Sequence, residues 1–419
     1  MNISFNKYKF FSILLQVAIF FLLEYAYKHF VAPLYEYEHF LYEYNSLKYI
    51  ETKLLFFFVL LVINFKNPSP FIYAVNQIFF LFMFSPNLIV YEYNPATPRL
   101  IIYSIAVFLI LLHILGFIRV KVKTVKLTEK QFVILILFLI VLMLIPIVAY
   151  YKFNLNLKVL EFKDVYKVRL ENRPPNALIA YSYTWLSKIL LPVLLAYSII
   201  RKKYGLSIFA IVLLLYLYLT QAHKSVFFST LLIIYFYFFK NYYKKIFFFL
   251  FLLFVAIITV HFLYVFMGKL MPESLLVRRV LFLPAVINKL YFSAFKDQPL
   301  FLSHSVFSSF FHYPYQLDPP HLIGKIFFHS PQTNVNNGFI SDGYMNFGSL
   351  GVWIYVVLVA ITIKFFDLFY IDSRYYGIFF YIIFTLISSY FLTSLMTHGI
   401  LILMLLALFF LRDYQKIEL

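Results

Sequence analysis

The stretch that decides the fold is Phe132-Val-Ile-Leu-Ile-Leu-Phe-Leu-Ile-Val-Leu-Met-Leu-Ile-Pro-Ile-Val-Ala-Tyr150, which contains no charged residue. A helix needs about 20 mostly apolar residues to cross the hydrocarbon core of a bilayer, and this stretch meets that requirement. The whole chain of 419 residues has the same character, because 63% of its residues are hydrophobic and only 13% are charged. Soluble domains are roughly 45–50% apolar and about 25% charged. We therefore expect an integral membrane protein without separate soluble domains.

Similar apolar stretches recur along the chain and predict about 12 membrane-spanning helices. The expected fold is all-α, a polytopic helical bundle that forms one membrane domain over residues 1–419. The first stretch lacks a small-residue cleavage site, so we expect it to be a span and not a signal peptide. The candidate spans lie near residues 10–25, 54–65, 71–91, 100–118, 132–150, 178–200, 206–220, 226–239, 246–267, 350–366, 378–397 and 400–411.

Basic residues in short loops predict the orientation, because they favour the cytoplasmic side of a membrane. Basic connectors lie at residues 119–126, 201–203 and 240–245, and two expected spans separate each from the next. All three connectors and both termini therefore fall on one side, which we take as the cytoplasm. The long connections that then face outward are residues 26–53, 151–177 and 268–349. The last of them precedes the tenth span and is large enough for a small subdomain.

The net charge is +18, from 36 Lys and Arg against 18 Asp and Glu. In a membrane protein this excess orients the spans or binds anionic ligands and lipid headgroups. We expect no nucleic-acid partner, because the chain has no basic soluble domain. The absence of cysteine excludes disulfides, thiolate nucleophiles and cysteine metal sites.

Histidine spacing in the loop 268–349 does not predict a metal site. The four histidines of this loop follow one another at intervals unlike the helical HExxH pair. One of them, acting as a general base or as a hydrogen-bond donor to phosphate, fits this pattern better, and His312 is our candidate for the base. The four residues are His304, His312, His321 and His329.

The loop 151–177 carries six cations on the side where the positive-inside rule disfavours them. One interpretation is a site for a diphosphate or an anionic sugar, since Arg offers paired donors to phosphate oxygens. Arg169 and Arg173 are the candidates there. The other interpretation is a solvated loop whose cations pair with Glu161, Asp164 and Glu171.

Two further places hold cations near apolar spans. Lys224 follows His223 in a tight outer turn, where it either reaches the membrane interface or points into an outer cavity. Arg278 and Arg279 open the loop 268–349, and Arg279 lies among Leu, Phe and Val. An Arg in such surroundings needs a partner, which a phosphate oxygen or a nearby carboxylate would provide.

The polar stretch at residues 334–351 leads into a membrane helix. Its Asn, Asp, Ser and Tyr residues supply neutral hydrogen bonds that suit sugar hydroxyls, with Asn336, Asn337, Asp342 and Tyr344 as candidates. Its four glycines permit close approach of the backbone. The alternative is a glycine-rich turn with capping Asp and Ser side chains.

These motifs, in their order along the chain, resemble those of the bacterial O-antigen polymerases, the oligosaccharide repeat-unit polymerase family. The resemblance covers about residues 130–400. The motifs are Val165-Tyr166-Lys-Val-Arg169, His223-Lys224-Ser225, Arg279-Val-Leu-Phe-Leu-Pro284, Tyr291-Phe292-Ser-Ala-Phe295, Asn336-Asn337-Gly338-Phe339-Ile340-Ser341-Asp342-Gly343-Tyr344 and Asn346-Phe347-Gly348-Ser-Leu-Gly351-Val352.

The resemblance implies a GT-C-like glycosyltransferase on the outer face of the bacterial cytoplasmic membrane. Such enzymes move the growing chain from undecaprenyl diphosphate onto the next lipid-linked repeat unit. The implied partners are therefore undecaprenyl-diphosphate-linked oligosaccharides as donor and acceptor, the membrane lipid, and a regulator of polysaccharide chain length. No metal and no other cofactor is implied. The product would be O-antigen or a related surface polysaccharide.

Fixed cations are expected to stabilise the charge that develops on the leaving diphosphate. We assign this role to Arg169, Arg279 and Lys224, with Arg173 and Arg278 as alternates. Asp342 or His312 is the candidate base. The expected substrate-binding residues are Tyr166, Arg173, Arg278, Asn336, Asn337 and Tyr344.

Two other functions stay open. An O-antigen ligase shares the lipid donor and the large outer loop, but transfers the chain to the lipid A core. A flippase or exporter of lipid-linked oligosaccharide would place cations along its spans, where Lys188 is the clearest example in this sequence.

Overall fold

The structure is a computed structural model that describes residues 6–120, 122, 127–157, 159, 168–169, 171–305 and 307–411, with the backbone but not the side chains of residues 224, 225 and 228. The regular elements of these residues are helices. Three apolar helices of 10–17 residues are among them, Arg99–Leu115, Ser229–Phe238 and Ile400–Phe409. The prediction of an all-α, polytopic membrane protein is confirmed. Within the described part of the chain, seven segments are long and apolar enough to cross a membrane: Lys7–Leu34, Pro70–Tyr93, Glu129–Tyr151, Ala177–Ile200, Tyr204–Gln221, Tyr242–Met267 and Phe339–Asp367.

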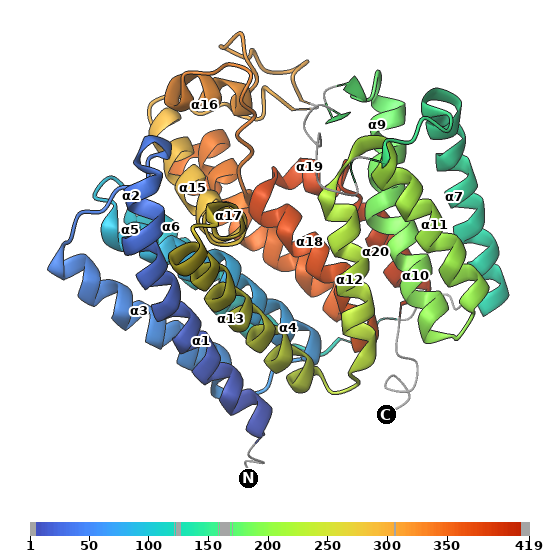
Figure 1. Cartoon of the computed structure of the whole chain (residues 1–419), viewed down its shortest axis with the longest axis horizontal. Helices are drawn as coiled ribbons and strands as arrows, with labels where there is room; N and C mark the ends of the chain where they lie inside the picture. Colours follow the sequence, from blue (N-terminus) through green and yellow to red (C-terminus); the bar gives the residue numbers. More distant parts are fainter. Residues whose placement is uncertain are drawn as a thin grey trace. The chain divides into compact units, whose positions relative to one another are not determined.

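The chain forms two compact units (Figure 1). Unit 1 comprises Met1–Ile118, Tyr242–Lys364 and Leu386–Phe391. Its helical elements are α1 (Lys7–Ala26), η1 (Tyr27–Val31), α2 (Ala32–Leu34), η2 (Glu36–Glu38), α3 (Ser46–Phe65), α4 (Pro70–Phe79), η3 (Phe80–Phe84), α5 (Ser85–Tyr93), α6 (Arg99–Leu115), α13 (Tyr242–Met267), α14 (Leu270–Glu273), η6 (Ser274–Phe282), α15 (Leu283–Ala294), α16 (Pro319–Phe328) and most of α17 (Phe339–Asp367).

Unit 2 comprises Arg119–Asn241, Phe365–Thr385 and Leu392–Leu419. Its helical elements are α7 (Glu129–Tyr151), α9 (Ala177–Trp185), η5 (Leu186–Leu190), α10 (Leu191–Ile200), α11 (Tyr204–Gln221), α12 (Lys224–Phe238), η7 (Ser373–Tyr375), most of α18 (Tyr376–Ser388), most of α19 (Phe391–Leu395) and α20 (Ile400–Phe409).

Polar side chains fix where several helices begin. The Asn6 side chain accepts hydrogen bonds from the first-turn N–H groups of α1, and Asn45 does the same for α3. Thr128 and Gln131 form a reciprocal capping box at the start of α7. These side chains satisfy N–H groups that have no partner inside the helix. The helix starts are thus encoded locally, by polar residues placed directly before apolar runs.

Four π-helical segments each end one residue before an X-Pro step. Proline has no N–H and its ring clashes with the carbonyl four residues earlier. A π-turn widens the helix and accommodates this clash without breaking the span. Lys188 lies in one of these segments, so its side chain projects from a distorted turn. The prolines concerned are Pro33, Pro86, Pro192 and Pro284, which follow η1, η3, η5 and η6.

Helix α17 contains a sharp kink in the polar stretch at residues 334–351. Phe347 and Gly348 have non-helical backbone angles, and Gly348 has φ +59°. A Cβ atom on Gly351 would lie 2.0 Å from the carbonyl oxygen of Gly343, so the two backbones touch. The predicted close approach of the backbone at these glycines is confirmed. The kink brings the polar residues of the first turns of α17 into the interior of unit 1.

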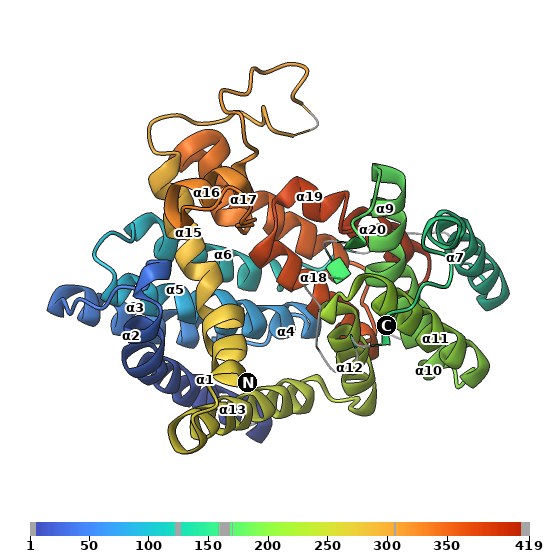
Figure 2. The same cartoon turned by 45° about the horizontal axis from the view of Figure 1, so that its top comes forward.

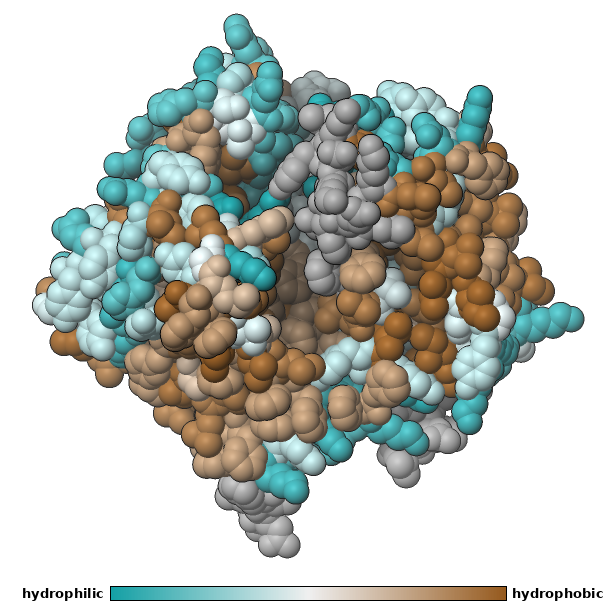
Figure 3. Space-filling view, viewed as in Figure 1, coloured by the Kyte–Doolittle hydropathy of each residue, from teal (hydrophilic) through white to brown (hydrophobic). Residues whose placement is uncertain are grey.

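Helix α1 packs against α13 in unit 1 (Figure 1). Phe11 and Phe247 approach each other with ring centroids 6.1 Å apart, and Phe20 stacks on Phe56 of α3 at 4.0 Å. Figure 3 shows apolar residues over the α1 and α13 surface and hydrophilic residues near α16. An apolar lateral surface with polar ends is what a bilayer requires of the helices that contact it.

The segment 268–349, expected as a long loop, contains helices of its own. It holds α14, η6, α15, α16 and the first turns of α17. Figure 2 shows α15, α16 and the nearby part of α17 gathered at one end of unit 1, with the connection over residues 295–318 extending beyond them. The helix-like apolar pattern predicted near residues 275–295 is confirmed by η6 and α15.

In unit 2, α10 and α11 pack along each other and α7 packs against α9. The stretch 378–397, expected as one span, is divided. α18 ends at Ser388 and α19 is a short helix that ends at Leu395. The chain then turns at Gly399, which has φ +82°, before α20 begins. This interruption places His398 in a turn.

Candidate functional site

The connection over residues 151–177 is tied to the C-terminal end of α11, whose last carbonyl groups have no partner within the helix. The Arg169 guanidinium donates two hydrogen bonds to the Ala222 carbonyl, at 3.2 Å from Nε and 3.0 Å from Nη2. Asn172 Nδ2 donates to the Thr220 carbonyl at 2.7 Å. A cation at a helix C-terminus also meets the negative end of the helix dipole. The predicted site residue Arg169 therefore also caps a helix.

This cap orders the turn that holds His223. Ala222 has a left-handed backbone with φ +56°, and His223 is the residue directly before α12. The His223 ring lies 5.5 Å from the Tyr183 ring. Burial, followed by the charges of Arg169 and Lys188, lowers the pKa of His223 to about 4. The imidazole is therefore neutral at pH 7, and two cations lie close to it.

Lys188 is the second of these cations. Its ammonium donates a hydrogen bond to Nδ1 of His398 at 2.9 Å and lies 5.5 Å from the centre of the Tyr381 ring. None of the salt bridges formed among the described residues involves Lys188. A buried cation held by neutral groups is costly unless an anion compensates its charge.

His398 is fixed by the turn between α19 and α20. Its backbone N–H donates to the Thr393 carbonyl at 2.9 Å, and the Trp185 indole N–H donates to the Met396 carbonyl at 2.9 Å. Burial, followed by the charge of Lys188, lowers the pKa of His398 to about 3. This second imidazole is also neutral at pH 7.

We call Arg169, Lys188, His223 and His398 the basic cluster. It combines two cations with two neutral imidazoles in a largely buried part of unit 2. Cations and N–H donors together bind phosphate oxygens well, and the low dielectric of a buried site strengthens these bonds. The arrangement suits recognition of an anion that carries phosphate.

A second group of polar residues lies in unit 1, around the start of α17. Asp342 is 2% exposed. One carboxylate oxygen accepts a hydrogen bond from Asn346 Nδ2 at 2.9 Å and the other accepts one from the Phe391 N–H at 2.7 Å. Both oxygens of Asp342 are thus engaged within the fold, which favours a positioning role over that of a general base.

Two tyrosines and a histidine adjoin this carboxylate. Tyr291 donates to the Val335 carbonyl at 2.7 Å, and its hydroxyl lies 3.3 Å from that of Tyr390. The His304 ring lies 5.3 Å from the Tyr390 ring. Burial lowers the pKa of His304 to about 4, and Asp318 opposes this shift. His304 is half-buried, whereas His312, which was predicted as a candidate base together with Asp342, is exposed.

Unit 1 also holds buried polar atoms without a hydrogen-bond partner among the described residues. Both amide atoms of Asn337, which is 1% exposed, have no hydrogen-bond partner there. Ser303 Oγ and His304 Nδ1 also lack a partner among the described residues. We call Tyr291, Ser303, His304, Asn337, Asp342, Asn346 and Tyr390 the polar cluster. Its neutral donors and acceptors are the kind that bind hydroxyl groups.

The structure pairs Arg278 within the fold. Its guanidinium contacts the Glu38 carboxylate and donates to Ser274 Oγ at 3.0 Å. It also lies over the Tyr35 ring, 4.4 Å from the centroid. Glu273, a carboxylate close to Arg279 in the sequence, pairs with His261 at 2.8 Å. Arg278 therefore stabilises unit 1 through contacts that need no ligand.

The structure describes the remaining predicted site residues in part. Tyr344 stacks on Phe292 with ring centroids 3.9 Å apart. Tyr166 lies outside the described residues, and Lys224 begins α12 without a described side chain. The predicted site residues that the structure places at exposed positions are Arg173, Arg279, His312 and Asn336.

The sequence analysis missed an ion network in the first 100 residues. Lys53 donates to one carboxylate oxygen each of Glu24 and Glu92, at 2.7 Å in both cases. Glu24 also accepts from Lys28 at 2.7 Å and from the Tyr93 hydroxyl at 2.6 Å. Charged residues within apolar helices are the signal that could have revealed it, because they need partners there.

The contact between His398 and Lys188 was missed for a related reason. Lys188 interrupts the apolar stretch 178–200, and His398 interrupts the last apolar stretches. The sequence alone does not show that the two residues meet. Among the described residues, no group of three or more His, Asp or Glu side chains could hold a metal ion.

Comparisons of the chain with protein-family models, with curated proteins and with solved structures find no match. The geometry of the two clusters and the membrane-protein fold are therefore the basis for the functional proposal.

Proposed function

We propose that this chain is a membrane glycosyltransferase that polymerises oligosaccharide repeat units carried on undecaprenyl diphosphate into O-antigen or a related surface polysaccharide. The observation that carries the proposal is the basic cluster. A lipid diphosphate is an anion that resides in a membrane, and the cluster supplies half-buried cations and N–H donors in an apolar helical unit. The order of motifs that resembles the O-antigen polymerases supports the same substrate class.

In this proposal the acceptor hydroxyl attacks the anomeric carbon of the donor sugar. A new glycosidic C–O bond forms while the C–O bond to the diphosphate breaks, with inversion expected at that carbon. The bonding electrons leave with undecaprenyl diphosphate, and the hydroxyl proton passes to a base. Lys188 and Arg169 stabilise the negative charge on the leaving diphosphate, and the neutral imidazoles of His223 and His398 donate hydrogen bonds to its oxygens.

The polar cluster of unit 1 is proposed, separately from the basic cluster, to bind hydroxyl groups of the oligosaccharide units. The unpartnered amide of Asn337 and the hydroxyl of Ser303 provide donors and acceptors without charge. The half-buried imidazole of His304 is neutral, and its unpartnered Nδ1 can form a hydrogen bond with a sugar hydroxyl. Asp342 positions the backbone beside Tyr390 through the N–H of Phe391.

The finer architectural features belong to the same proposal. They are about 12 spans in a GT-C-like arrangement, both termini in the cytoplasm, and the reaction on the periplasmic face of the bacterial inner membrane. The proposed partners are the lipid-linked donor and acceptor, membrane lipid, and a regulator of chain length.

The test is elongation of lipid-linked repeat units by purified protein in detergent, resolved as a ladder of chain lengths. Lys188→Met should lower the rate about 10²–10³-fold, as loss of one donor to developing charge commonly does. Lys188→Arg keeps a cation and should retain more activity. Lys66→Met, at an exposed position outside both clusters, is the matched control. The proposal fails if the wild-type protein forms no ladder.

Cells that lack the chain distinguish the polymerase from the ligase. Loss of a polymerase leaves lipid A core capped with single repeat units, whereas loss of a ligase leaves the core bare. The ligase is the alternative that an uncapped core would favour.

The flippase is favoured by one observation, because Lys188 lies within the membrane-spanning segment Ala177–Ile200. Transport in reconstituted vesicles without any elongation in detergent would support the flippase and exclude the polymerase.

A further inference from the structure

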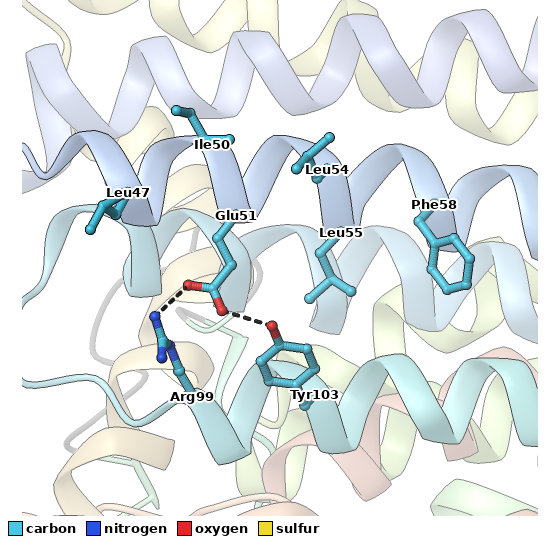
Figure 4. A pocket seen from close by; sticks show the side chains of 8 residues that line it. All are labelled: Leu47, Ile50, Glu51, Leu54, Leu55, Phe58, Arg99 and Tyr103. Atoms are coloured by element: carbon cyan, nitrogen blue, oxygen red, sulfur yellow. Dashed lines mark hydrogen bonds and ion pairs between the residues drawn. The ribbon is translucent and has the colours of Figure 1, made fainter.

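A groove of about 640 Å³ lies between α3 and α6 in unit 1 (Figure 4). Its apolar wall comes from α3 and its polar end from Glu51, Arg99 and Tyr103. Neither the basic cluster nor the polar cluster includes any of these residues. The groove therefore needs an explanation separate from the proposed reaction.

The apolar wall continues along one exposed face of α3. Positions three and four residues apart share a face of a helix, and the residues at this spacing are large and exposed. Leu54 is 67% exposed and Leu61 is 66% exposed. A continuous exposed stripe of this kind on a membrane protein is suited to a lipid chain. The stripe consists of Leu47, Ile50, Leu54, Phe58, Leu61 and Phe65.

A network of donors surrounds Glu51 at the polar end. The Tyr103 hydroxyl donates to Glu51 Oε1 at 2.7 Å, and the Tyr91 hydroxyl donates to Oε2 at 2.6 Å. Arg99 Nη2 lies 3.2 Å from the same Oε2, and Arg99 Nε donates to the Tyr91 hydroxyl at 3.1 Å. The Glu51 carboxylate thus interacts with three donors, which are the two tyrosine hydroxyls and the Arg99 guanidinium.

Arg99 retains capacity to bind an anion. Its side chain is 67% exposed, and no described contact engages its Nη1. It is the first residue of α6, where Pro98 provides no side-chain cap. The helix N-terminus adds partial positive charge and free N–H groups beside the guanidinium. Lys48 lies close enough to Arg99 for the two charges to interact, and Glu43 also faces Lys48.

We propose that this groove binds an anionic phospholipid, with the phosphate on Arg99 at the start of α6 and an acyl chain along the exposed stripe of α3. Charge complementarity selects the headgroup, because a guanidinium and a helix N-terminus both favour phosphate. The apolar stripe adjoins that polar end directly, as the two parts of a lipid require. This inference does not depend on the proposed polymerase.

The test uses a tryptophan reporter and brominated lipids in nanodiscs. Trp185 and Trp353, the two native tryptophans, are replaced by Phe, and Leu61→Trp places a reporter on the stripe beyond the groove. Phe138→Trp, on the exposed face of α7, is the matched control. Brominated phosphatidylglycerol is titrated into phosphatidylcholine, and the reverse titration uses brominated phosphatidylcholine.

We expect half-maximal quenching of the reporter on α3 at a mole fraction of phosphatidylglycerol at least about threefold lower than for the control, a preference of about 0.7 kcal/mol. Brominated phosphatidylcholine should quench both reporters alike. Arg99→Gln should abolish the preference, and Arg99→Lys, which keeps the charge, should retain part of it.

The inference is overturned if both reporters respond alike to phosphatidylglycerol, or if the two lipids quench the α3 reporter equally. It is also overturned if folded Arg99→Gln protein keeps the full preference. Should Arg99→Gln not fold, the comparison of the two lipids with Arg99 intact still decides the result. None of these measurements uses elongation, so their outcome is independent of the proposed function.

Discussion

Two lysines, one in each unit, show two ways in which this fold holds a cation. Lys53 in unit 1 has a side chain 14% exposed and donates to Glu24 and Glu92, each at 2.7 Å. Lys188 in unit 2 donates to the neutral imidazole of His398 and lies over the Tyr381 ring. The first cation is neutralised within the fold, whereas the second is held by groups that carry no charge.

The difference indicates which cation is structural and which is available to a ligand. A buried ion pair contributes little net stability, but removal of one partner is strongly destabilising because it leaves a buried charge unpaired. A cation held by neutral groups leaves no unpaired partner when it is removed. Lys53 should therefore matter for folding, and Lys188 for binding.

Replacement of Lys53 should give the largest loss of stability. Lys53→Met leaves two buried carboxylates without their shared cation, and we expect the free energy of unfolding to fall by about 3–5 kcal/mol. Lys188→Met should lower it by less than this, because no carboxylate is left behind. Thermal unfolding of both purified variants in detergent, followed by intrinsic fluorescence, measures the difference.

A triple variant provides the control. Lys53→Met with Glu24→Gln and Glu92→Gln removes Lys53 together with both of its carboxylate partners, and should recover part of the stability lost in Lys53→Met. Equal losses for Lys53→Met and Lys188→Met would contradict the distinction between the two lysines.

A carboxylate extends the same comparison. Asp342 resembles Lys53 in being satisfied within the fold, by Asn346 and by the Phe391 N–H. Asp342→Asn replaces one of the two accepting oxygens with an NH2 group, so either Asn346 Nδ2 or the Phe391 N–H loses its acceptor, and we expect a loss of about 1–3 kcal/mol. Elongation per folded molecule should change little. A loss of more than about tenfold with normal stability would instead support the base role predicted from the sequence.

The helices were predictable because a membrane-spanning segment is recognised from the length and apolar composition of a single stretch of sequence. Residues 132–150 are long and apolar enough to span a bilayer, and the structure places them in α7. The close approach of Gly343 and Gly351 was also predictable, since glycine spacing is a local property of the sequence. The division of the stretch 378–397 was not, because its apolar composition continues through the break between α18 and α19.

The candidate site was predictable only in part, because partners are set by tertiary contacts. Arg169 was identified from its place in a cationic loop, but its bond to the Ala222 carbonyl depends on the end of α11. Arg278 looked like an anion site, whereas Glu38, distant in the sequence, neutralises it. His398 carries no motif, and only the fold brings it to Lys188. A sequence shows where a charged residue interrupts an apolar stretch, but it does not show which groups of the fold neutralise that charge.

The smallest expected effect is a pH dependence of stability from His223. Its pKa is about 4 in the folded protein and about 6.5 in an unfolded chain. Between these values the unfolded state binds more protons, so the free energy of unfolding falls as the pH decreases from 7 to 4. From pH 7 to 5.5 we expect His223 to account for about 1 kcal/mol of this decrease.

His223→Gln should remove that part of the pH dependence, and thermal unfolding at the two pH values measures it. The lowered pKa values of His304 and His398 also make the free energy of unfolding fall as the pH decreases. The readout is therefore the difference in pH dependence between the wild-type protein and the variant. An anion bound to the basic cluster would favour the protonated imidazole and raise the pKa of His223. Inorganic pyrophosphate should therefore make the wild-type protein less sensitive to acid and leave His223→Gln unaffected. An identical response of both proteins to pyrophosphate would contradict anion binding beside His223, whereas a selective response would link the basic cluster of unit 2 to its ligand.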